Sequence, residues 1–429
     1  MYTINVSRLN VSITLRHYRT SRARYSLEKS RYYAAVLLAS ICVTYFVENF
    51  LRSAAGALTP VLIQELGISH GAMGLLVSAY FFVYGLMQLP SGILSDTFGA
   101  KKTILGFTAL TVVGVFLFWA STSYGLLFAA QLLVGVGCST FYINAVKLVS
   151  TWFSPDRRAT AIGVLSASSG LGNAVSYIGF PLAMEALGGW RRLYLGMSAI
   201  LVANWTMNFL ILKEREELQA SRSAGRGPIL ASVGFALRDP RIYPFLAGYI
   251  SASTGWVFMN WVTQYLMDAK GFTYLQAGQI ASLGTLAGIP GCIAVAWVSD
   301  RLRSRKLPLV GFAGLYAATL AVFYLLPAST PIALYMALSF TLNFCISFWV
   351  LFFSMIPETL PPETASIGLG IVNGAGTIGF SFIAPVYGAL VDVTGGYGAS
   401  NAMILGAAAV TPIIFLLFVK ECYGRSPEE

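Results

Sequence analysis

The chain has 429 residues, of which 56% are hydrophobic and only 11% are charged. A water-soluble domain carries roughly 25% charged residues, so the composition excludes an ordinary soluble protein and predicts an all-α integral membrane protein. The formal net charge of +10 would suit a nucleic-acid partner, unless the basic residues follow the topology of a membrane protein.

The N-terminal segment, residues 1–31, contains seven basic residues and one acidic residue. It has no apolar core of the kind found in a signal peptide, so we expect a disordered, basic cytoplasmic tail that touches anionic lipid head groups. An Arg-rich, acid-poor start also resembles an organelle transit peptide, which is the alternative interpretation.

Twelve apolar stretches follow, each long enough to cross a bilayer, since a spanning helix takes roughly 20 mostly apolar residues. They lie near residues 32–59, 70–93, 103–120, 124–152, 159–184, 190–212, 243–267, 274–299, 307–326, 331–357, 365–391 and 398–420. The only long polar interruption is residues 213–241, which we interpret as a cytoplasmic linker that includes a short helix on the membrane surface. Residues 421–429 form a C-terminal tail.

The basic residues follow this topology. If the amino terminus is cytoplasmic, 23 of the 28 Lys and Arg residues fall in the tails and in the loops on that side. This positive-inside pattern predicts a protein of the cell membrane with both termini in the cytoplasm. It explains the net charge by orientation and contact with the lipid bilayer, and therefore excludes nucleic acid as the partner.

The two halves of the chain repeat each other. At a spacing of 204 residues, Gly74 matches Gly278 and Ser95-Asp96 matches Ser299-Asp300, and later the spacing becomes 207, as for Gly188 and Gly395. The sequence therefore predicts two pseudo-symmetric six-helix bundles, residues 32–212 and 242–420. A substrate site between duplicated halves is typical of secondary transporters.

Several kinds of chemistry have no residues to support them. The sequence has no Gly-x-x-x-x-Gly-Lys-Ser/Thr loop for a nucleotide phosphate, and its two histidines, His17 and His70, are not part of any cluster with metal-ligand spacing. We therefore expect no cofactor, no metal site and no enzymatic activity. We interpret His70 as a residue of an external loop.

The loop between the second and third spans carries the most specific motif, Gly92-Ile-Leu-Ser-Asp96-Thr-Phe-Gly99-Ala-Lys101-Lys102. It resembles the signature of the major facilitator superfamily, and Ser299-Asp300-Arg301 echoes it in the second half. The resemblance implies that family's fold of six plus six helices around a central cavity. It also implies a conformational latch on the cytoplasmic side, formed by Asp96, Gly99, Lys101 and Asp300 with Arg157 or Arg158 as partner. The alternative is that these charges only set the topology.

The segment from Lys147 through Arg158 to Gly163, with Gly170-x-Gly172 and Gly189-Trp190-Arg191 after it, resembles the branch of the family that carries organic anions with cations. The first span agrees, since it contains Glu48 and Arg52. Drug and proton antiporters have a Gly-Pro in the fifth span that is absent after Gly172 here.

Three full charges lie well inside the spans: Glu48, Arg52 and Lys147. Charges in a spanning helix usually face a cavity and have a use. Arg52 can present a planar fork of donors to an anion, so we predict that it binds substrate, and Glu48 can carry the coupled proton. The alternative is that the pair neutralise each other and only hold the first helix in place. Lys147 is close enough to the cytoplasmic end to extend to the interface.

Polar side chains on other spans add to the predicted substrate site. On the second span these are Tyr84 and Gln88, on the seventh Asn260 and Gln264, and on the eleventh Asn373. Amides inside a membrane need hydrogen-bond partners, although packing is the alternative for each of these residues.

The sequence thus predicts a monomeric transporter that moves a small organic anion by alternating access, with the proton as coupling ion in symport. The alternatives are a drug and proton antiporter, a uniporter of a neutral metabolite, and a transporter-shaped metabolite sensor.

Overall fold

The computed structural model describes residues 6–213, 229–421 and 423, and within these ranges every regular element is a helix. The middle of the predicted linker, residues 214–228, and most of the C-terminal tail lie outside the described residues. The predicted boundaries of the bundles, linker and tails therefore stay predictions.

The first half forms nine helices, of which α2 is a short helix after the first span and the other eight correspond to six spans. The second and fourth spans are each split in two, as α3 with α4 and α6 with α7. The bounds are α1 (Val6–Ala57), α2 (Thr59–Leu66), α3 (His70–Leu86), α4 (Gln88–Phe98), α5 (Ala100–Ala120), α6 (Tyr124–Cys138), α7 (Phe141–Trp152), α8 (Pro155–Leu187) and α9 (Trp190–Ile211).

The second half repeats this order after a short helix at the end of the linker. Its tenth span is split into α15 and α16. The bounds are α11 (Ile229–Arg238), α12 (Ile242–Lys270), α13 (Tyr274–Leu302), α14 (Lys306–Leu325), α15 (Ile332–Ile346), α16 (Trp349–Thr359), α17 (Pro362–Thr394) and α18 (Gly398–Phe418). Within the described residues, nine helices are long and apolar enough to cross a membrane. The second, fifth and seventh spans, in α3 with α4, α8 and α12, complete the predicted twelve.

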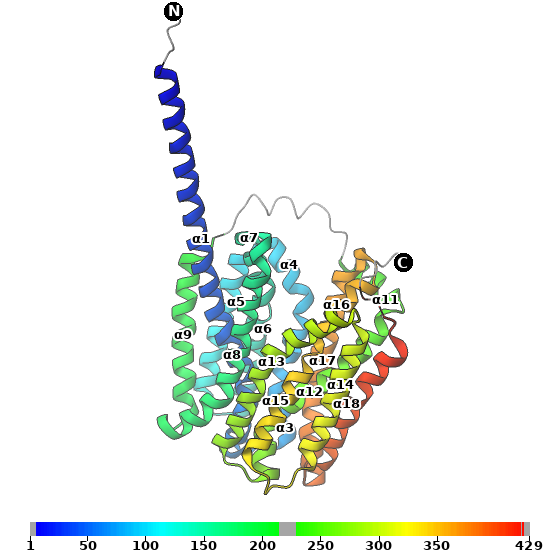
Figure 1. Ribbon diagram of the computed structural model, residues 1–429. Coiled ribbons are helices and arrows are strands. Elements are labelled where there is room, and N and C mark those ends of the chain that lie inside the picture. Colours follow the sequence, from blue (N-terminus) through cyan, green and yellow to red (C-terminus); the bar gives the residue numbers. More distant parts are fainter. Residues whose placement is uncertain (1–5, 214–228, 422, 424–429) are drawn as a thin grey trace, which may run out of the picture.

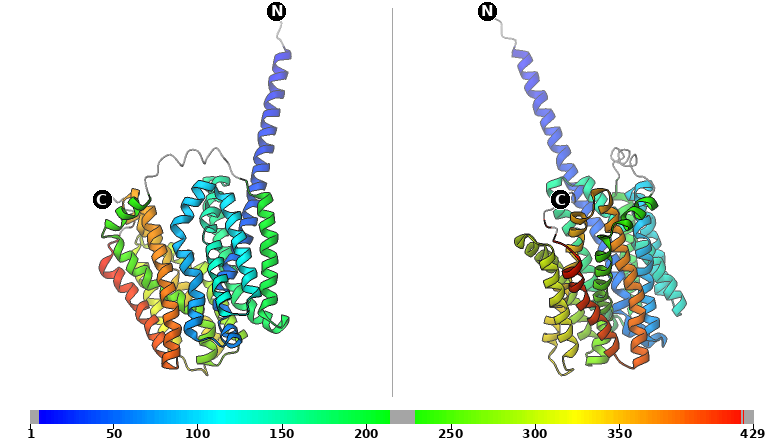
Figure 2. Two further views of the ribbon diagram at one scale, coloured as in Figure 1. Left: turned by 180° about the vertical axis from the view of Figure 1, so that it is seen from behind. Right: turned by 90° about the vertical axis from the view of Figure 1, so that its right-hand side faces the viewer.

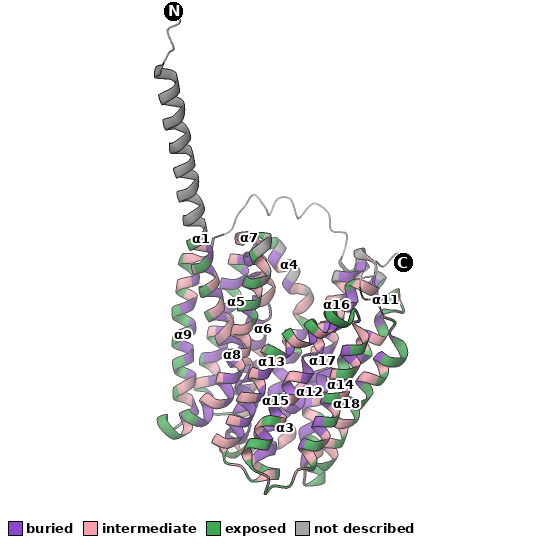
Figure 3. Ribbon diagram, viewed as in Figure 1, coloured by how far each residue is buried: buried purple, intermediate pink, exposed green. Residues whose placement is uncertain are grey.

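The helices form two bundles that lie side by side, the first half at the left and the second at the right of Figure 1. The ends of α9 and α18 and the short helix α11 are on one face, which we call the linker face (Figures 1 and 2). The opposite face, where α3 and α13 begin, is called the far face. Buried residues concentrate between the helices and exposed ones on the periphery, where a membrane would be (Figure 3).

The first helix is longer than predicted. It begins at Val6 and continues to Ala57, so the prediction of a disordered tail is wrong from residue 6 onward. The reason is local, because the chain contains neither proline nor glycine before Gly56, and these are the two residues that break helices most strongly.

The internal repeat reappears in the turns of the far face. Gly67 and Gly271 end matching helices with φ of 60° and 72°, and Gly188 and Gly395 do so with φ of 66° and 67°. Such left-handed positions favour glycine because it has no Cβ to clash. Each repeated glycine therefore marks the same turn in both halves, as expected for two pseudo-symmetric bundles.

The halves meet along a seam where α3 packs on α17 and α8 packs on α13. Glycines allow this close approach, because a Cβ at Gly74 would lie 2.5 Å from the carbonyl oxygen of Ala384. A Cβ at Gly278 would lie 2.5 Å from that of Tyr177 in the same way. Small residues let backbones come together in lipid, where dispersion contacts replace the hydrophobic effect.

Replacing Gly74 by valine should separate the halves at the seam. The added atoms have no room, and overpacking of this kind typically destabilises a protein by about 1–3 kcal/mol. We expect Gly74→Val to lower the melting temperature in detergent, whereas Gly106→Val, at a helix position with open space around it, should change it little. Equal melting temperatures for the two variants would contradict a tight seam.

Candidate functional site

Arg52 is held by aromatic rings at the seam. Its guanidinium carbon lies 5.0 Å from the ring centre of Phe81 and 5.5 Å from that of Tyr84. Tyr249 of the second half is also close enough to interact with it electrostatically. Among the residues that the structure describes, Arg52 has no carboxylate partner in an ion pair. The site therefore contains a cation that is surrounded by rings and not neutralised.

The aromatic contacts alone do not offset the free-energy cost of placing Arg52 in a membrane span. A cation over an aromatic face gains about 0.5–2 kcal/mol, whereas placing an arginine at the centre of a spanning helix costs about 2.5–3.5 kcal/mol on insertion scales. The rings thus offset only part of the cost. A planar guanidinium offers five N–H donors, so an anionic group with two oxygens would complete the site.

Glu48, one turn before Arg52, is more deeply buried. It is 2% exposed, and its Oε1 has no hydrogen-bond partner among the described residues. Its neighbours include Tyr80 and Cys138 of the same half. An ionised carboxylate in such surroundings requires a partner, which the described residues do not provide in this conformation.

Glu48 and Arg52 do not neutralise each other in this structure. Within the described chain they form no ion pair, although both lie near enough to Tyr80, Tyr84 and Cys138 to interact with them electrostatically. The alternative interpretation, a structural pair that only holds α1 in place, therefore has no contact to support it.

Asn260 of α12 lies across the seam from this region. A Cβ on Gly56 of α1, one turn beyond Arg52, would lie 2.7 Å from its Oδ1. The Nδ2 of Asn260 donates to the carbonyl of Trp256 at 2.9 Å, while Oδ1 has no partner in the described structure. Asn260 thus has a free acceptor close to the helix that carries Arg52.

The remaining predicted substrate residues are in different places. Gln88 begins α4, one turn after Tyr84, and its buried Nε2 has no partner among the described residues. Asn373 lies on α17 where that helix passes Gly85 of α3. Gln264 is not part of this group, because its Nε2 donates to Asp268 Oδ2 at 2.8 Å near the far face.

The predicted latch residues of the first half surround the turn between α4 and α5. Gly99 adopts φ of 85° there, which requires glycine. Lys101 Nζ donates to the carbonyl of Phe209 at 2.9 Å, and Arg158 donates to that of Ser150 at 2.8 Å. Arg157 is exposed, and the side chain of Asp96 lies outside the described residues.

In the second half, Asp300 belongs to a network near the end of α13. Arg305 pairs with Asp300 at 2.8 Å and with Glu358 at 3.1 Å. Partial burial opposes ionisation of the neighbouring Glu421, but hydrogen bonds from Ser304 and from backbone N–H groups hold its pKa below its usual value. These contacts of Asp300 stay within one half, and its latch role remains a prediction.

Two residues contribute contacts that the sequence did not reveal. Lys147 Nζ donates to the carbonyl and hydroxyl oxygens of Ser95 at 2.9 and 3.1 Å, so it ties α7 to the helix that carries the loop motif. His70 contacts Asp392 of the other half at 2.9 Å. The position of Ser95 just before Asp96 in the loop motif was a signal for its contact with Lys147. The contact between His70 and Asp392 depends entirely on the packing of α3 on α17.

Two duplicated bundles with a half-buried cation at their seam define a membrane transporter of the two-bundle kind. The family model of the Major Facilitator Superfamily matches residues 41–384. The chain therefore belongs to this superfamily and is a transporter and not an enzyme. The fold and the resemblance predicted from the sequence are confirmed.

Similar proteins cover nearly the whole chain. The probable sulfoacetate transporter of Cupriavidus necator is 24% identical over 92% of this chain and 96% of its own length. The hexuronate transporter of Bacillus subtilis is 26% identical, over 88% and 93%. Among solved structures, an inward-facing bacterial homolog of the human lysosomal transporter Spinster matches with a TM-score of 0.67 and 13% identity, over 90% and 95%. This last similarity shows the fold alone.

Replacing Lys147 by methionine should loosen α7 from α4. The change keeps the length of the side chain but removes hydrogen bonds from a charged group, which contribute about 1.5–3 kcal/mol each. We expect Lys147→Met to lower the melting temperature, and Lys102→Met, at an exposed position of the adjacent helix, to leave it nearly unchanged. If both variants melt alike, Lys147 does not fasten these helices.

Proposed function

We propose that this protein is a secondary active transporter of the cell membrane that carries a small organic anion by alternating access, with symport of protons. The observation that supports it most is the unneutralised guanidinium of Arg52 at the seam, close to both halves. The similarity to proteins named as sulfoacetate and hexuronate transporters supports an anionic substrate. The protein works as a monomer, because each chain contains both halves of the site.

In this proposal the linker face is cytoplasmic, as the positive-inside pattern of the loops predicts. The far face is then external. Polar contacts across the seam gather toward it, for example between the hydroxyl of Tyr274 and the carbonyl of Ala57 at 2.8 Å. The structure then corresponds to a conformation closed to the outside, from which substrate leaves toward the cytoplasm.

Arg52 and Glu48 have complementary roles in the proposed cycle. Arg52 binds the anionic group of the substrate with its planar fork of donors, and Glu48 carries the proton, because a buried carboxyl without a partner is stable only when neutral. Asn260, with its free acceptor, would receive a hydrogen bond from a substrate hydroxyl. Tyr84, Gln88, Gln264 and Asn373 remain proposed substrate residues, of which Gln264 would act from the far-face end of the site.

Two other transport modes and one non-transport role are alternatives, and flux measurements distinguish them. A drug and proton antiporter would export hydrophobic cations, and a uniporter of a neutral metabolite would be insensitive to pH and voltage. A metabolite sensor would bind its ligand without moving it across proteoliposomes. An importer that brings in more protons than substrate charges would instead respond to voltage, because each charge gains roughly 2.3 kcal/mol per 100 mV.

Glu48→Gln should abolish uphill accumulation but leave exchange of substrate for substrate. The amide keeps the shape of a protonated carboxyl and cannot release a proton. One proton per substrate across one pH unit supports about tenfold accumulation, since one pH unit corresponds to 1.36 kcal/mol. We expect this tenfold ratio in proteoliposomes with the unaltered chain and with the exposed-site control Glu185→Gln, and a ratio near one with Glu48→Gln. Accumulation that survives the change would refute the coupling role.

Arg52→Lys should weaken binding of the anion. Lysine keeps the charge but lacks the planar fork, and a lost hydrogen bond to a charged group corresponds to about 1.5–3 kcal/mol, or roughly tenfold or more in Kd. The probe is the compound that raises the melting temperature most among sugar acids, aldarates and sulfonates, and its Kd is measured by titration. The exposed control Arg192→Lys should bind normally. An unchanged Kd for Arg52→Lys would show that the guanidinium does not hold the anion.

A further inference from the structure

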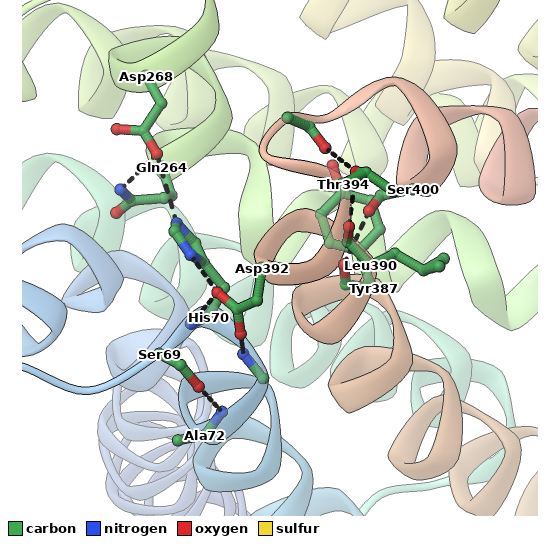
Figure 4. Close-up of polar contacts among 12 residues, drawn as sticks. Ser69, His70, Ala72, Gln264, Asp268, Tyr387, Leu390, Asp392, Thr394 and Ser400 are labelled. Atoms are coloured by element: carbon green, nitrogen blue, oxygen red, sulfur yellow. Dashed lines mark hydrogen bonds and ion pairs between the residues drawn. The ribbon is translucent and has the colours of Figure 1, made fainter.

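At the far face, a carboxylate of one half caps a helix of the other. Helix α3 begins at His70, and its first N–H groups have no partner within the helix. The N–H of His70 donates to Oδ1 of Asp392 at 3.0 Å, and that of Gly71 donates to Oδ2 at 2.8 Å. Asp392 comes from α17 of the second half, as Figure 4 shows. A negative charge at a helix amino terminus is also favoured by the helix dipole.

The ring of His70 lies between two carboxylates of the second half. Its Nδ1 donates to Oδ1 of Asp392 at 2.9 Å, because a carboxylate can only accept. Its Nε2 faces Oδ2 of Asp268 at 3.6 Å, which is within ion-pair range but too long for a hydrogen bond. Asp268 also accepts from Gln264 at 2.8 Å and from the hydroxyl of Tyr397 at 2.7 Å. Asp268, Asp392 and Tyr397 are the titratable groups that face this ring.

A neutral imidazole carries one N–H and can serve only one of these carboxylates, whereas the imidazolium carries two. The side chains of His70, Asp268 and Asp392 are 23%, 39% and 29% exposed, so solvent protons can reach them. Each ring contact joins the first half to the second, and therefore each must break before the far face can open.

We propose that His70, Asp392 and Asp268 form a proton-binding lock that holds the far face closed. A proton on His70 gives the ring a second donor and a positive charge between two carboxylates of the opposite half. When the far face opens, the ring loses both carboxylates to water. The closed form thus binds this proton more tightly than the open form.

Linkage fixes the direction of the effect. A proton that binds the closed form more tightly shifts the population toward that form as the pH at the far face falls, and the shift is lost as pH rises past the titration of His70. If the pKa of His70 is one unit higher in the closed form than in the open form, protonation changes the ratio of closed to open molecules about tenfold. This lock goes beyond the proposed function and does not depend on Glu48 or on the identity of the substrate.

The test measures opening of the far face directly, without substrate. Spin labels on Thr122→Cys and Ser329→Cys, two exposed loop positions of opposite halves, report the distance across the far face in purified protein free of other cysteines. From pH 5.5 to pH 8, we expect the long-distance population to increase several-fold in the otherwise unaltered chain. In His70→Gln, which can still donate to Asp392 but cannot titrate, this population should not depend on pH.

Asp268→Asn provides the second variant, because it removes one carboxylate but leaves the capping of α3 intact. We expect its opening to move to lower pH and to have a smaller amplitude. The exposed-site control Glu185→Gln should open like the unaltered chain. Because opening is measured without substrate and without a proton gradient, failure of the lock and failure of proton coupling are distinguishable. A full pH response in His70→Gln, or an unshifted response in Asp268→Asn with normal melting, would overturn the proposal.

Discussion

The close contact between the two halves at the far face is the constraint on which the rest of the structure depends. It requires glycine at Gly74 and Gly278, where any side chain would strike the backbone of the other half. It also gives α3 a cap from another helix, because the N–H groups of His70 and Gly71 donate to Asp392. The far face is closed, and Arg52 lies on α1 just before the end that reaches this face. It is next to residues of both halves, and the proposed substrate site is built on that position.

Polar networks within each half and polar contacts between the halves have different locations. Near the linker face, Lys147 ties α7 to α4, and Arg305 joins Asp300 to Glu358 within the second half. Such contacts keep a bundle rigid while it moves as a unit. The contacts of His70 cross the seam at the far face, so a rocking motion can break and remake them. This division is what alternating access by two rigid bundles requires.

In the proposed function, Arg52 and Glu48 give one helix two tasks. They are one turn apart on α1 and share Tyr80 and Tyr84 as neighbours, but the described residues form no ion pair between them, and the guanidinium of Arg52 lies over the rings of Phe81 and Tyr84. Charges that paired with each other would have little capacity left for a substrate or a proton. Because they do not pair in this conformation, the proposed roles, an anion held by the guanidinium and a proton carried by the carboxyl, do not compete with each other.

The sequence by itself determined the spans, the duplication and the family, because apolar length, glycine turns and the loop motif are local signals that tertiary packing does not alter. It also singled out Glu48 and Arg52, since a full charge in an apolar stretch is conspicuous in one dimension. Only the tertiary structure decided what each polar residue contacts. It placed Gln264 with Asp268 and gave His70, predicted to be a simple loop residue, two partners that follow it by almost 200 and more than 300 residues. The physical reason is that these partners meet only when α3 packs against α17, which brings His70 to the end of α12, and no local pattern encodes that packing.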